Sequence, residues 1–346
     1  MLQIHSPFLT YGELCDADLF IPDGVERPPV IIIAHGLGHP RFIATMRYAR
    51  GLVLNGYAVF LFDYRNYGFS EGEVKNLTDP FCQMDDIRAA IVHLRSLEII
   101  DNTRIVLCGI SLAGGYPLTI AAEDHDIVAV VCMIPVMSPK VSLKKKKKTA
   151  ALPYLLLTSY DAIRGLIGLK PFCLPMFVSR SHLNDFTDST YYPGYTFDCS
   201  HIHGKRVVHH IAIKNILTGQ SVVWINLVPF RSLKKILEYE AVSALPRVRC
   251  PILVIAAKND PVVPYSLLKS MMEPYSNVNF FSYEGNHYNV TDKRVCDEII
   301  TEILKLLTNL FDKPVSDKPA SFDIESEKRH LYPLVLNQQK VNVIEI

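Results

Sequence analysis

Long apolar runs, cysteine pairs and an excess of one charge are all missing from this sequence of 346 residues. No stretch approaches the roughly 18 uncharged apolar residues that a membrane-spanning helix needs. The formal net charge is only +1, so nothing global attracts nucleic acid or an acidic substrate. The N-terminus has no basic start followed by an apolar run, and we therefore expect no signal peptide.

The eight cysteines are scattered, and none forms a Cys-x-x-Cys pair. Several of them lie in apolar segments that have the pattern of buried strands. Cysteines in such segments are usually core residues that stay reduced. Disulfides persist mainly in oxidising compartments, so this pattern indicates a reducing one. We therefore expect a cytoplasmic protein.

Hydrophobic residues make up 49% of the chain, which is ample for a sizeable core. Short apolar, β-branched segments alternate with amphipathic helical patterns, as is typical of α/β proteins. The predicted strands cover residues 30–36, 57–63, 104–109, 126–135, 250–257 and 278–285, and the predicted helices cover 41–54, 80–94, 112–123 and 292–311. This order predicts a mostly parallel sheet with helices on both faces.

The alternation stops after residue 135 and resumes only near residue 246. Helical apolar pieces at 152–157 and 172–177 lie in this stretch, and they would line an acyl pocket or form a core of their own. A stretch of this length is too long for a loop within a compact domain, so we predict an inserted cap. The predicted units are a core (1–134 and 246–312), the cap or lid (135–245) and a loosely attached polar tail (313–346).

The segment Gly109-Ile110-Ser111-Leu112-Ala113-Gly114 lies at the predicted junction between a buried strand and a helix. A turn this sharp strains the serine backbone, needs small neighbours and points the hydroxyl out above the sheet. The helix N-terminus beside it favours a developing negative charge. Ser111 is therefore the candidate nucleophile, although an ordinary N-cap serine would produce the same pattern.

The glycine-rich segment His35-Gly36-Leu37-Gly38 ends an earlier predicted strand. Such a turn can direct a backbone N–H group at the same negative charge, and Leu37 is the expected donor. The N–H of Leu112, directly after the serine, would be the second donor. We expect His35 to brace the turn rather than to accept a proton.

A nucleophilic serine needs a base, and the base needs an acid that fixes its tautomer. Asp260 and His287 follow the last two predicted strands, where loops converge with the one that carries Ser111. Each also has an ordinary interpretation, as an Asp-Pro turn and as a loop histidine. Their joint occurrence in these positions predicts a Ser111–His287–Asp260 triad.

These segments resemble the α/β-hydrolase superfamily over residues 12–135 and 246–311. The resemblance is carried by "AHGLG" (34–38), "GYAVFLFDYRNYGFSEGE" (56–73), "GISLAGGYPLTIAAEDHDIVAVVCMIP" (109–135), "CPILVIAAKNDPVVP" (250–264) and "YEGNHYNV" (283–290). Within the superfamily, the chain is most similar to bacterial hydrolases of the dipeptidyl-peptidase S15-like and acetyl-xylan-esterase-like branch. The resemblance implies the α/β-hydrolase fold, the same triad, and a structural loop at 63–72 that borders the site.

Two further patterns are unusual in composition. Five consecutive lysines at 144–148 could contact a membrane surface or act as an import signal, but a solvated loop is the simpler interpretation. Because the sequence shows no adjacent apolar face, we expect no stable membrane association. His201, His203, His209 and His210 lack a zinc-binding spacing, so we expect no metal and no cofactor.

The residues together predict a serine hydrolase that cleaves an ester, in preference to an amide, through an acyl-enzyme. The expected partner is a small-molecule ester or acyl substrate, with no nucleic acid. The nearer alternative is an acyltransferase that passes the acyl group to an alcohol or an amine. The more distant one is a binding protein on the same fold, although binding alone does not need all three triad residues.

Overall fold

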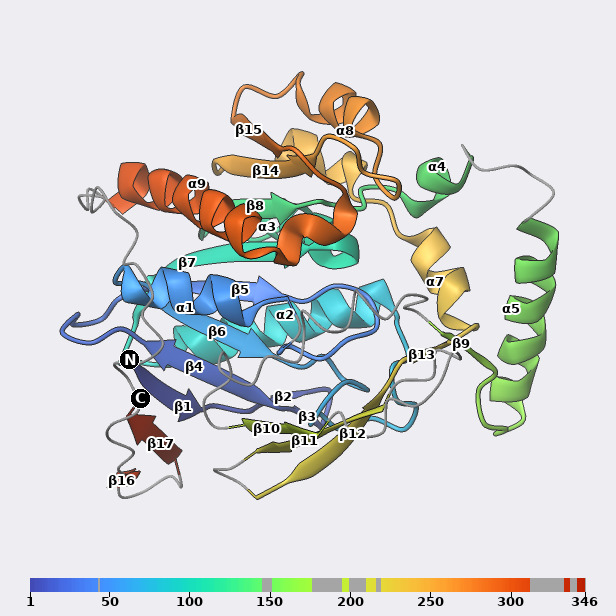
Figure 1. Ribbon diagram of the computed structural model, residues 1–346, viewed down its shortest axis with the longest axis horizontal. Helices are drawn as coiled ribbons and strands as arrows, with labels where there is room; N and C mark the ends of the chain where they lie inside the picture. The colour runs from blue at the N-terminus through green and yellow to red at the C-terminus, as the bar shows by residue number, and fades with distance from the viewer. Residues whose placement is uncertain are drawn as a thin grey trace.

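A sheet of ten described strands lies at the centre of the structure (Figure 1), a computed structural model. The residues described are 1–42, 44–144, 151–175, 195–198, 210–215, 219–311, 333–336 and 341–345. Across the sheet the order is β15 (Val278–Tyr283), β14 (Ile252–Ala257), β8 (Ile127–Met133), β7 (Asp101–Ile110), β5 (Pro29–Ala34), β6 (Ala58–Phe62), β4 (Ala17–Ile21), β1 (Leu2–His5), β17 (Val341–Glu345) and β16 (Pro333–Leu336). Strands β15 to β6 run parallel, which confirms the predicted mostly parallel sheet.

The two edges of the sheet differ in their strand direction. The parallel strands β5, β6, β8 and β14 are continuous apolar runs because both of their faces are covered. The antiparallel strands β4 and β1 were not predicted, because Asp18 interrupts the apolar pattern of β4 and β1 has only four residues. The tail, which was expected to be loosely attached, contributes β17, which pairs with β1.

Helices cover both faces of the sheet, as the alternating pattern predicted. Helices α1 (Met46–Leu54) and α9 (Lys293–Phe311) pack on one face, and α2 (Pro80–Arg95), α3 (Tyr116–Ala121) and α8 (Tyr265–Met272) pack on the other. Helix α2 begins where Asp79 and Pro80 predict it. The Asp79 carboxylate accepts a hydrogen bond of 3.0 Å from the Phe81 N–H, and the proline occupies the first turn.

Two predicted helices begin differently from expectation. The helix predicted from residue 41 starts only at Met46, because Ala44 takes a left-handed conformation with φ of 67°. The helix predicted from residue 112 starts as a 3-10 helix, η1 (Ser111–Gly115), and continues as α3. Both departures lie next to the candidate site, where tight turns replace regular helix.

The insertion between β8 and β14 has secondary structure of its own in its described parts. It contains α4 (Pro139–Lys144), α5 (Ala151–Leu166), β9 (Cys173–Pro175), β10 (Tyr195–Asp198), β11 (His210–Asn215), β12 (Ser221–Ile225), β13 (Leu227–Pro229), α7 (Ser232–Glu238) and the 3-10 helix η4 (Val242–Arg247). The helical piece predicted at 172–177 is wrong, because β9 is a strand that pairs with β13. Prolines at 171 and 175 disfavour a helix there.

The described cysteines are all free thiols. Cys15, Cys108, Cys132 and Cys296 are buried, as expected for core residues, and Cys82 is exposed. Burial raises the pKa of the Cys108 thiol to about 12. Buried thiols of this kind pack as small apolar side chains and are poor nucleophiles.

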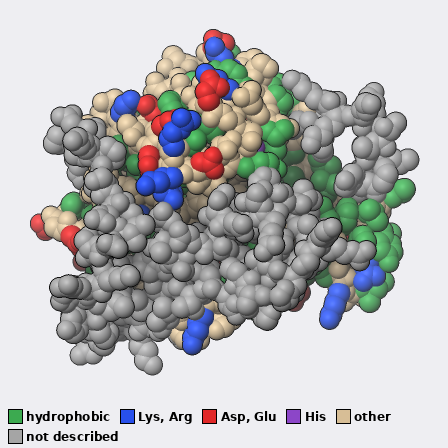
Figure 2. All heavy atoms as spheres, viewed as in Figure 1, with side chains coloured by type: hydrophobic (Ala, Val, Ile, Leu, Met, Phe, Trp, Pro, Cys, Tyr) green, Lys and Arg blue, Asp and Glu red, His purple; other side chains and the backbone are tan. Residues whose placement is uncertain are grey.

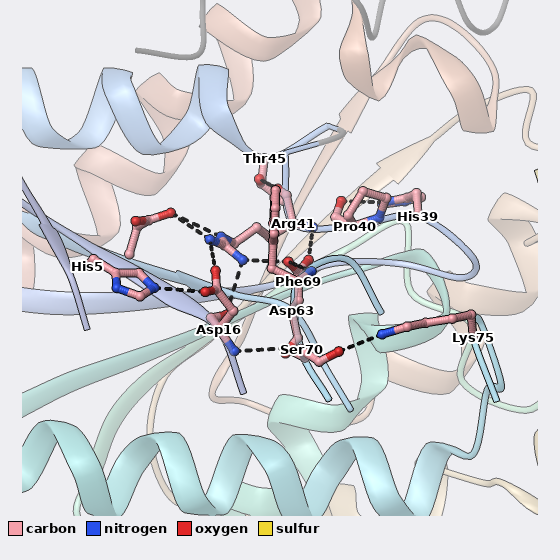
Figure 3. Close-up of polar contacts among 11 residues, drawn as sticks. His5, Asp16, His39, Pro40, Arg41, Thr45, Asp63, Phe69, Ser70 and Lys75 are labelled. Carbon is pink, nitrogen blue, oxygen red and sulfur yellow. Dashed lines mark hydrogen bonds and ion pairs between the residues drawn. The ribbon is translucent and has the colours of Figure 1, made fainter. Parts of the chain in front are cut away.

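A fully buried arginine, Arg41, joins the N-terminal strands to the turn that follows β5 (Figure 3). Its guanidinium donates to Asp18 Oδ2 at 2.9 and 3.1 Å and forms ion pairs with the carboxylates of Asp16 and Asp63. The Arg41 backbone N–H also donates to Asp63 Oδ1 at 2.7 Å. A buried guanidinium is tolerated only with such partners, so the four residues hold one another in place.

A second cation, His5, lies beside this cluster of three carboxylates. Burial would raise the pKa of Asp16, but Arg41 and His5 hold it below its usual value. Burial would lower the pKa of His5, but the hydrogen bond of 2.8 Å from His5 Nε2 to Asp16 raises it. Burial dominates at Asp63, whose pKa is raised. The protonated form of His5 is therefore favoured beside the carboxylates.

The turn at residues 35–41 also carries two buried histidines. The Nδ1–H of His35 donates to the Gly36 carbonyl at 3.1 Å, and the Nδ1–H of His39 donates to the Pro40 carbonyl at 3.2 Å. Burial lowers the pKa of His35 well below its usual value and that of His39 to about 4. Both rings are therefore neutral at neutral pH and hold the turn, which is the bracing role expected for His35.

Replacing Arg41 with methionine should lower the free energy of unfolding by about 3–5 kcal/mol, because three buried carboxylates lose their cation. Urea denaturation measures this change. The control Arg294→Met removes an arginine that is 77% exposed and should change stability by less than about 0.5 kcal/mol. Arg41→Lys keeps the charge without the planar fork and should be intermediate. Equal stabilities of R41M and R294M would contradict the argument.

Acid should destabilise the same turn. The pKa of His39 is about 4 in the folded protein and 6.5 without burial, so the unfolded chain binds the proton first as the pH falls. Stability is full above pH 6.5 and is lost towards pH 4, by about 3 kcal/mol from this residue. Urea denaturation across this range should show a smaller loss in His39→Gln than in the wild type. His125→Gln, at an exposed position, should follow the wild type, and equal losses in all three proteins would refute the assignment.

Candidate active site

Ser111 lies at a sharp turn between β7 and η1. Its φ angle is 57°, in the left-handed region that non-glycine residues rarely adopt. A Cβ atom added to Gly109 would overlap the Ala113 backbone, so the turn requires a glycine there. The sequence has Ala113 where this kind of turn usually has a second glycine. Ala113 is buried, so only a small side chain fits there.

The neighbouring strand fixes this turn from the side. The Val136 N–H, just after β8, donates to the Ser111 carbonyl at 2.9 Å. A Cβ atom added to Gly114 would stand 2.6 Å from the Pro135 Cα, so the backbone passes β8 at a distance that only glycine allows. These contacts with residues 135 and 136 thus hold the strained backbone around Ser111 in place.

Asp260 follows β14 in a loop that fixes its carboxylate. Oδ1 accepts hydrogen bonds from the N–H groups of Val262 at 2.7 Å and Val263 at 2.8 Å. Oδ2 accepts from His287 Nδ1 at 2.7 Å. Both oxygens have partners, so the carboxylate has one orientation, aimed at the histidine ring.

His287 is the first residue of the 3-10 helix η5 (His287–Thr291), which begins four residues after the end of β15. Asn286 caps this helix reciprocally with Asn289, whose side chain accepts from the Asn286 N–H at 2.7 Å. The Asn259 N–H donates to the Gly285 carbonyl at 2.9 Å and so ties the acid loop to the histidine loop. The local structure therefore sets the position of the imidazole before any substrate binds.

These three side chains form one hydrogen-bonded chain. A carboxylate only accepts, so His287 Nδ1 carries the proton that it shares with Asp260. Nε2 is then the acceptor for the Ser111 hydroxyl, and the Oγ–Nε2 distance is 2.8 Å. The His287 side chain is 8% exposed and that of Asp260 only 1%, whereas Ser111 is partly exposed. The arrangement can remove a proton from a serine that a ligand can reach.

The turn after β5 lies directly against the serine. A Cβ atom added to Gly36 would stand 3.3 Å from the Ser111 Cβ and 3.2 Å from the Ile110 carbonyl oxygen. Leu37 follows in this turn, and Leu112 is the second residue of η1, whose N–H has no partner within its helix. The two N–H groups expected to hold an oxyanion thus belong to segments in contact with each other.

Trp224 reaches this turn from the insertion. It lies on β12, and its buried indole donates from Nε1 to the Gly38 carbonyl at 2.9 Å. No local pattern in the sequence indicates this role, and the one available signal is that Trp224 is the only tryptophan of the chain. No local pattern indicates the role of Arg41 either, although it follows the glycine-rich turn and its partner Asp63 opens the loop at 63–72.

Other residues singled out in the sequence have no structural test. His201, His203 and His209 lie outside the described residues, and His210 begins β11. Of the lysine run, only Lys144 is described, as the last residue of α4. The predictions made for these two patterns therefore stay predictions.

Comparison with known proteins identifies relatives along most of the chain. A model described as "Alpha/beta hydrolase family" matches residues 30–288. The quorum-quenching protein AidA of Acinetobacter baumannii is 26% identical over 296 residues, which are 86% of this chain and 91% of AidA. The polyketide transferase GrgF of Penicillium is 25% identical over 150 residues, 43% of this chain and 49% of GrgF.

Solved structures give the same fold at lower sequence identity. The crystal structure of GrgF matches with a TM-score of 0.68 and 18% identity, over 90% of this chain and 99% of GrgF. The Pyrococcus furiosus esterase Pf2001 matches with a TM-score of 0.54 and 16% identity, over 88% and 91% of the two chains. The narrower resemblance to the S15-like and acetyl-xylan-esterase-like branch stays a prediction. The chain belongs to the alpha/beta hydrolase family.

Proposed function

We propose that this protein is a serine hydrolase that cleaves a carboxylic ester through an acyl-enzyme. The observation that supports it most directly is the hydrogen-bonded chain from Ser111 through His287 to Asp260. The family membership and a similar structure described as an esterase support the same reaction class. An ester is preferred to an amide because its alcohol leaves with less assistance than an amine.

The first half of the reaction acylates the serine. His287 Nε2 accepts the hydroxyl proton while Ser111 Oγ attacks the carbonyl carbon, and the Asp260 carboxylate stabilises the imidazolium that forms. The N–H groups of Leu37 and Leu112 donate to the oxyanion of the tetrahedral intermediate. The ester C–O bond then breaks, and the leaving alcohol takes the proton from His287.

The second half releases the acyl group. A water molecule gives a proton to His287 Nε2 as its oxygen attacks the acyl carbon, and the same N–H groups hold the second oxyanion. The bond to Ser111 Oγ breaks, the serine recovers its proton from His287, and a carboxylic acid leaves. No cofactor is needed for either half.

An acyltransferase is the second candidate, and one comparison favours it. The relative GrgF is named a polyketide transferase, and transfer uses the same acyl-enzyme with an alcohol or amine in place of water. Adding an acceptor alcohol during turnover distinguishes the two reactions. A hydrolase gives mainly free acid, whereas a transferase gives mainly the new ester.

A fluorophosphonate should label the wild-type protein once, at Ser111, because this reagent reacts with activated serines. Intact mass spectrometry should find the adduct on the wild type and not on Ser111→Ala. Asp260→Asn should slow ester turnover by about 10⁴-fold, since it loses the favoured histidine tautomer. A panel of esters with increasing acyl length then identifies the preferred substrate.

The matched control for labelling is Ser276→Ala, which changes an exposed serine two residues before β15, at the end of that strand away from His287. It should retain the adduct. A folded wild type that gives no adduct and no ester turnover would contradict the proposed hydrolase and favour a binding protein on the same fold. An adduct that persists in S111A would assign the nucleophile to another residue.

We further propose that residues 135–245 act as a cap that helps to hold the oxyanion turn. Trp224→Phe keeps most of the ring but removes the donor to Gly38. It should lower kcat about tenfold with little change in KM, less than the 10²–10³-fold lost when a donor itself is removed. Val223→Ala, on the same strand with a side chain that is 55% exposed, is the control and should keep full activity. An unchanged kcat in W224F would refute this positioning role.

A further inference from the structure

Helix α5 presents apolar side chains to solvent. Leu156, Tyr160, Ile163 and Ile167, here called the α5 stripe, are 63%, 52%, 59% and 66% exposed. Ile167 continues the helix by one residue, because its N–H donates to the Ile163 carbonyl. Their spacing of four, three and four residues places them on one narrow face. Figure 2 shows hydrophobic side chains gathered over α5, with basic side chains at the lower edge.

The opposite face of α5 fixes this orientation. Asp161 is buried and accepts from Arg231, through the backbone N–H at 2.8 Å, Nε at 3.0 Å and Nη2 at 3.0 Å. A Cβ atom added to Gly165 would meet the same guanidinium. The helix therefore turns its ion pair inward and its apolar stripe outward, the reverse of an ordinary surface helix. Exposed apolar patches of this kind mark interaction sites.

The segment around the α5 stripe is strongly basic. Residues 136–175 contain eight lysines and arginines and one acidic residue, Asp161, which gives +7, while the whole chain is +1. The remainder of the chain is therefore −6. Among the described residues, Arg164 lies over the Tyr160 ring at 5.5 Å, and the exposed Lys170 follows four residues after the end of α5. The other charges include the five consecutive lysines of the sequence, directly before α5.

This charge decides between the possible occupants of the stripe. A second copy that docks its own α5 there, as in a two-fold dimer, would bring another segment of +7, and the two would repel each other. A nucleic acid would match the charge but not an apolar helix face. An anionic membrane surface matches both, since stable attachment of a surface helix takes buried apolar area together with basic residues. None of the described helices is long and apolar enough to cross a membrane.

We propose that the α5 stripe, with Arg164 and Lys170 beside it, binds the surface of an anionic phospholipid membrane. The helix lies in the plane of the interface, with Leu156 and Ile163 among the acyl chains and the cations at the headgroups. The expectation of no stable membrane association depended on the lack of an apolar face beside the lysines, and α5 supplies that face. This binding is independent of the proposed catalysis.

Sedimentation of the full chain with vesicles tests the proposal. The wild type should bind vesicles of phosphatidylserine and phosphatidylcholine, should bind pure phosphatidylcholine at least about tenfold more weakly, and should be released by salt. The double variant Leu156→Ser, Ile163→Ser should lose at least about tenfold in affinity. The charge variant Arg164→Gln, Lys170→Gln should weaken binding to the anionic vesicles only.

The control is Val92→Ser, which changes a residue on α2 that is 69% exposed and whose neighbouring arginines, Arg88 and Arg95, are both paired with acidic residues. It should bind as the wild type does. Thermal unfolding of the double variant should match the wild type, since both side chains are exposed. The proposal is overturned if the wild type does not bind anionic vesicles, or if the double variant binds them unchanged. It is also overturned if sedimentation velocity shows a wild-type dimer that the double variant loses.

Discussion

The buried charge of Arg41 links the N-terminal strands to the turn beside the candidate active site. Water cannot reach its guanidinium, so carboxylates of the protein must compensate its charge. These carboxylates belong to Asp16 before β4, Asp18 within β4 and Asp63 after β6. Arg41 also ends the turn that begins at His35. These ion pairs thereby join the antiparallel part of the sheet to the turn that lies against Ser111.

The two parts of the candidate site are held in place in different ways. Ser111 and its histidine and acid follow β7, β15 and β14, whose carboxyl ends meet at one edge of the sheet. The turn with Leu37 is held differently, by Arg41 from the core and by Trp224 from the insertion. Chemistry that needs both the serine and the turn therefore depends on two contacts made by residues outside the Ser111–His287–Asp260 chain.

The sequence predicts the parallel strands and the serine, acid and histidine turns because each has a local signal. Buried parallel strands are continuous apolar runs, and the serine turn needs its glycines nearby. Arg41 could not be found in this way, since its partners are distant in sequence. Nor could the outward stripe of α5, because apolar residues at helical spacing normally indicate a core. The contact between Asp161 and Arg231 shows which face of that helix is turned inward.

The position of the single indole has a practical consequence. All tryptophan emission of this chain comes from Trp224, which donates to the Gly38 carbonyl within the turn beside Ser111. Its fluorescence is therefore sensitive to one hydrogen bond between the insertion and the core, without any added label. A change in the conformation of the turn should therefore change the wavelength or intensity of this emission. That change can be followed in real time in the unmodified protein.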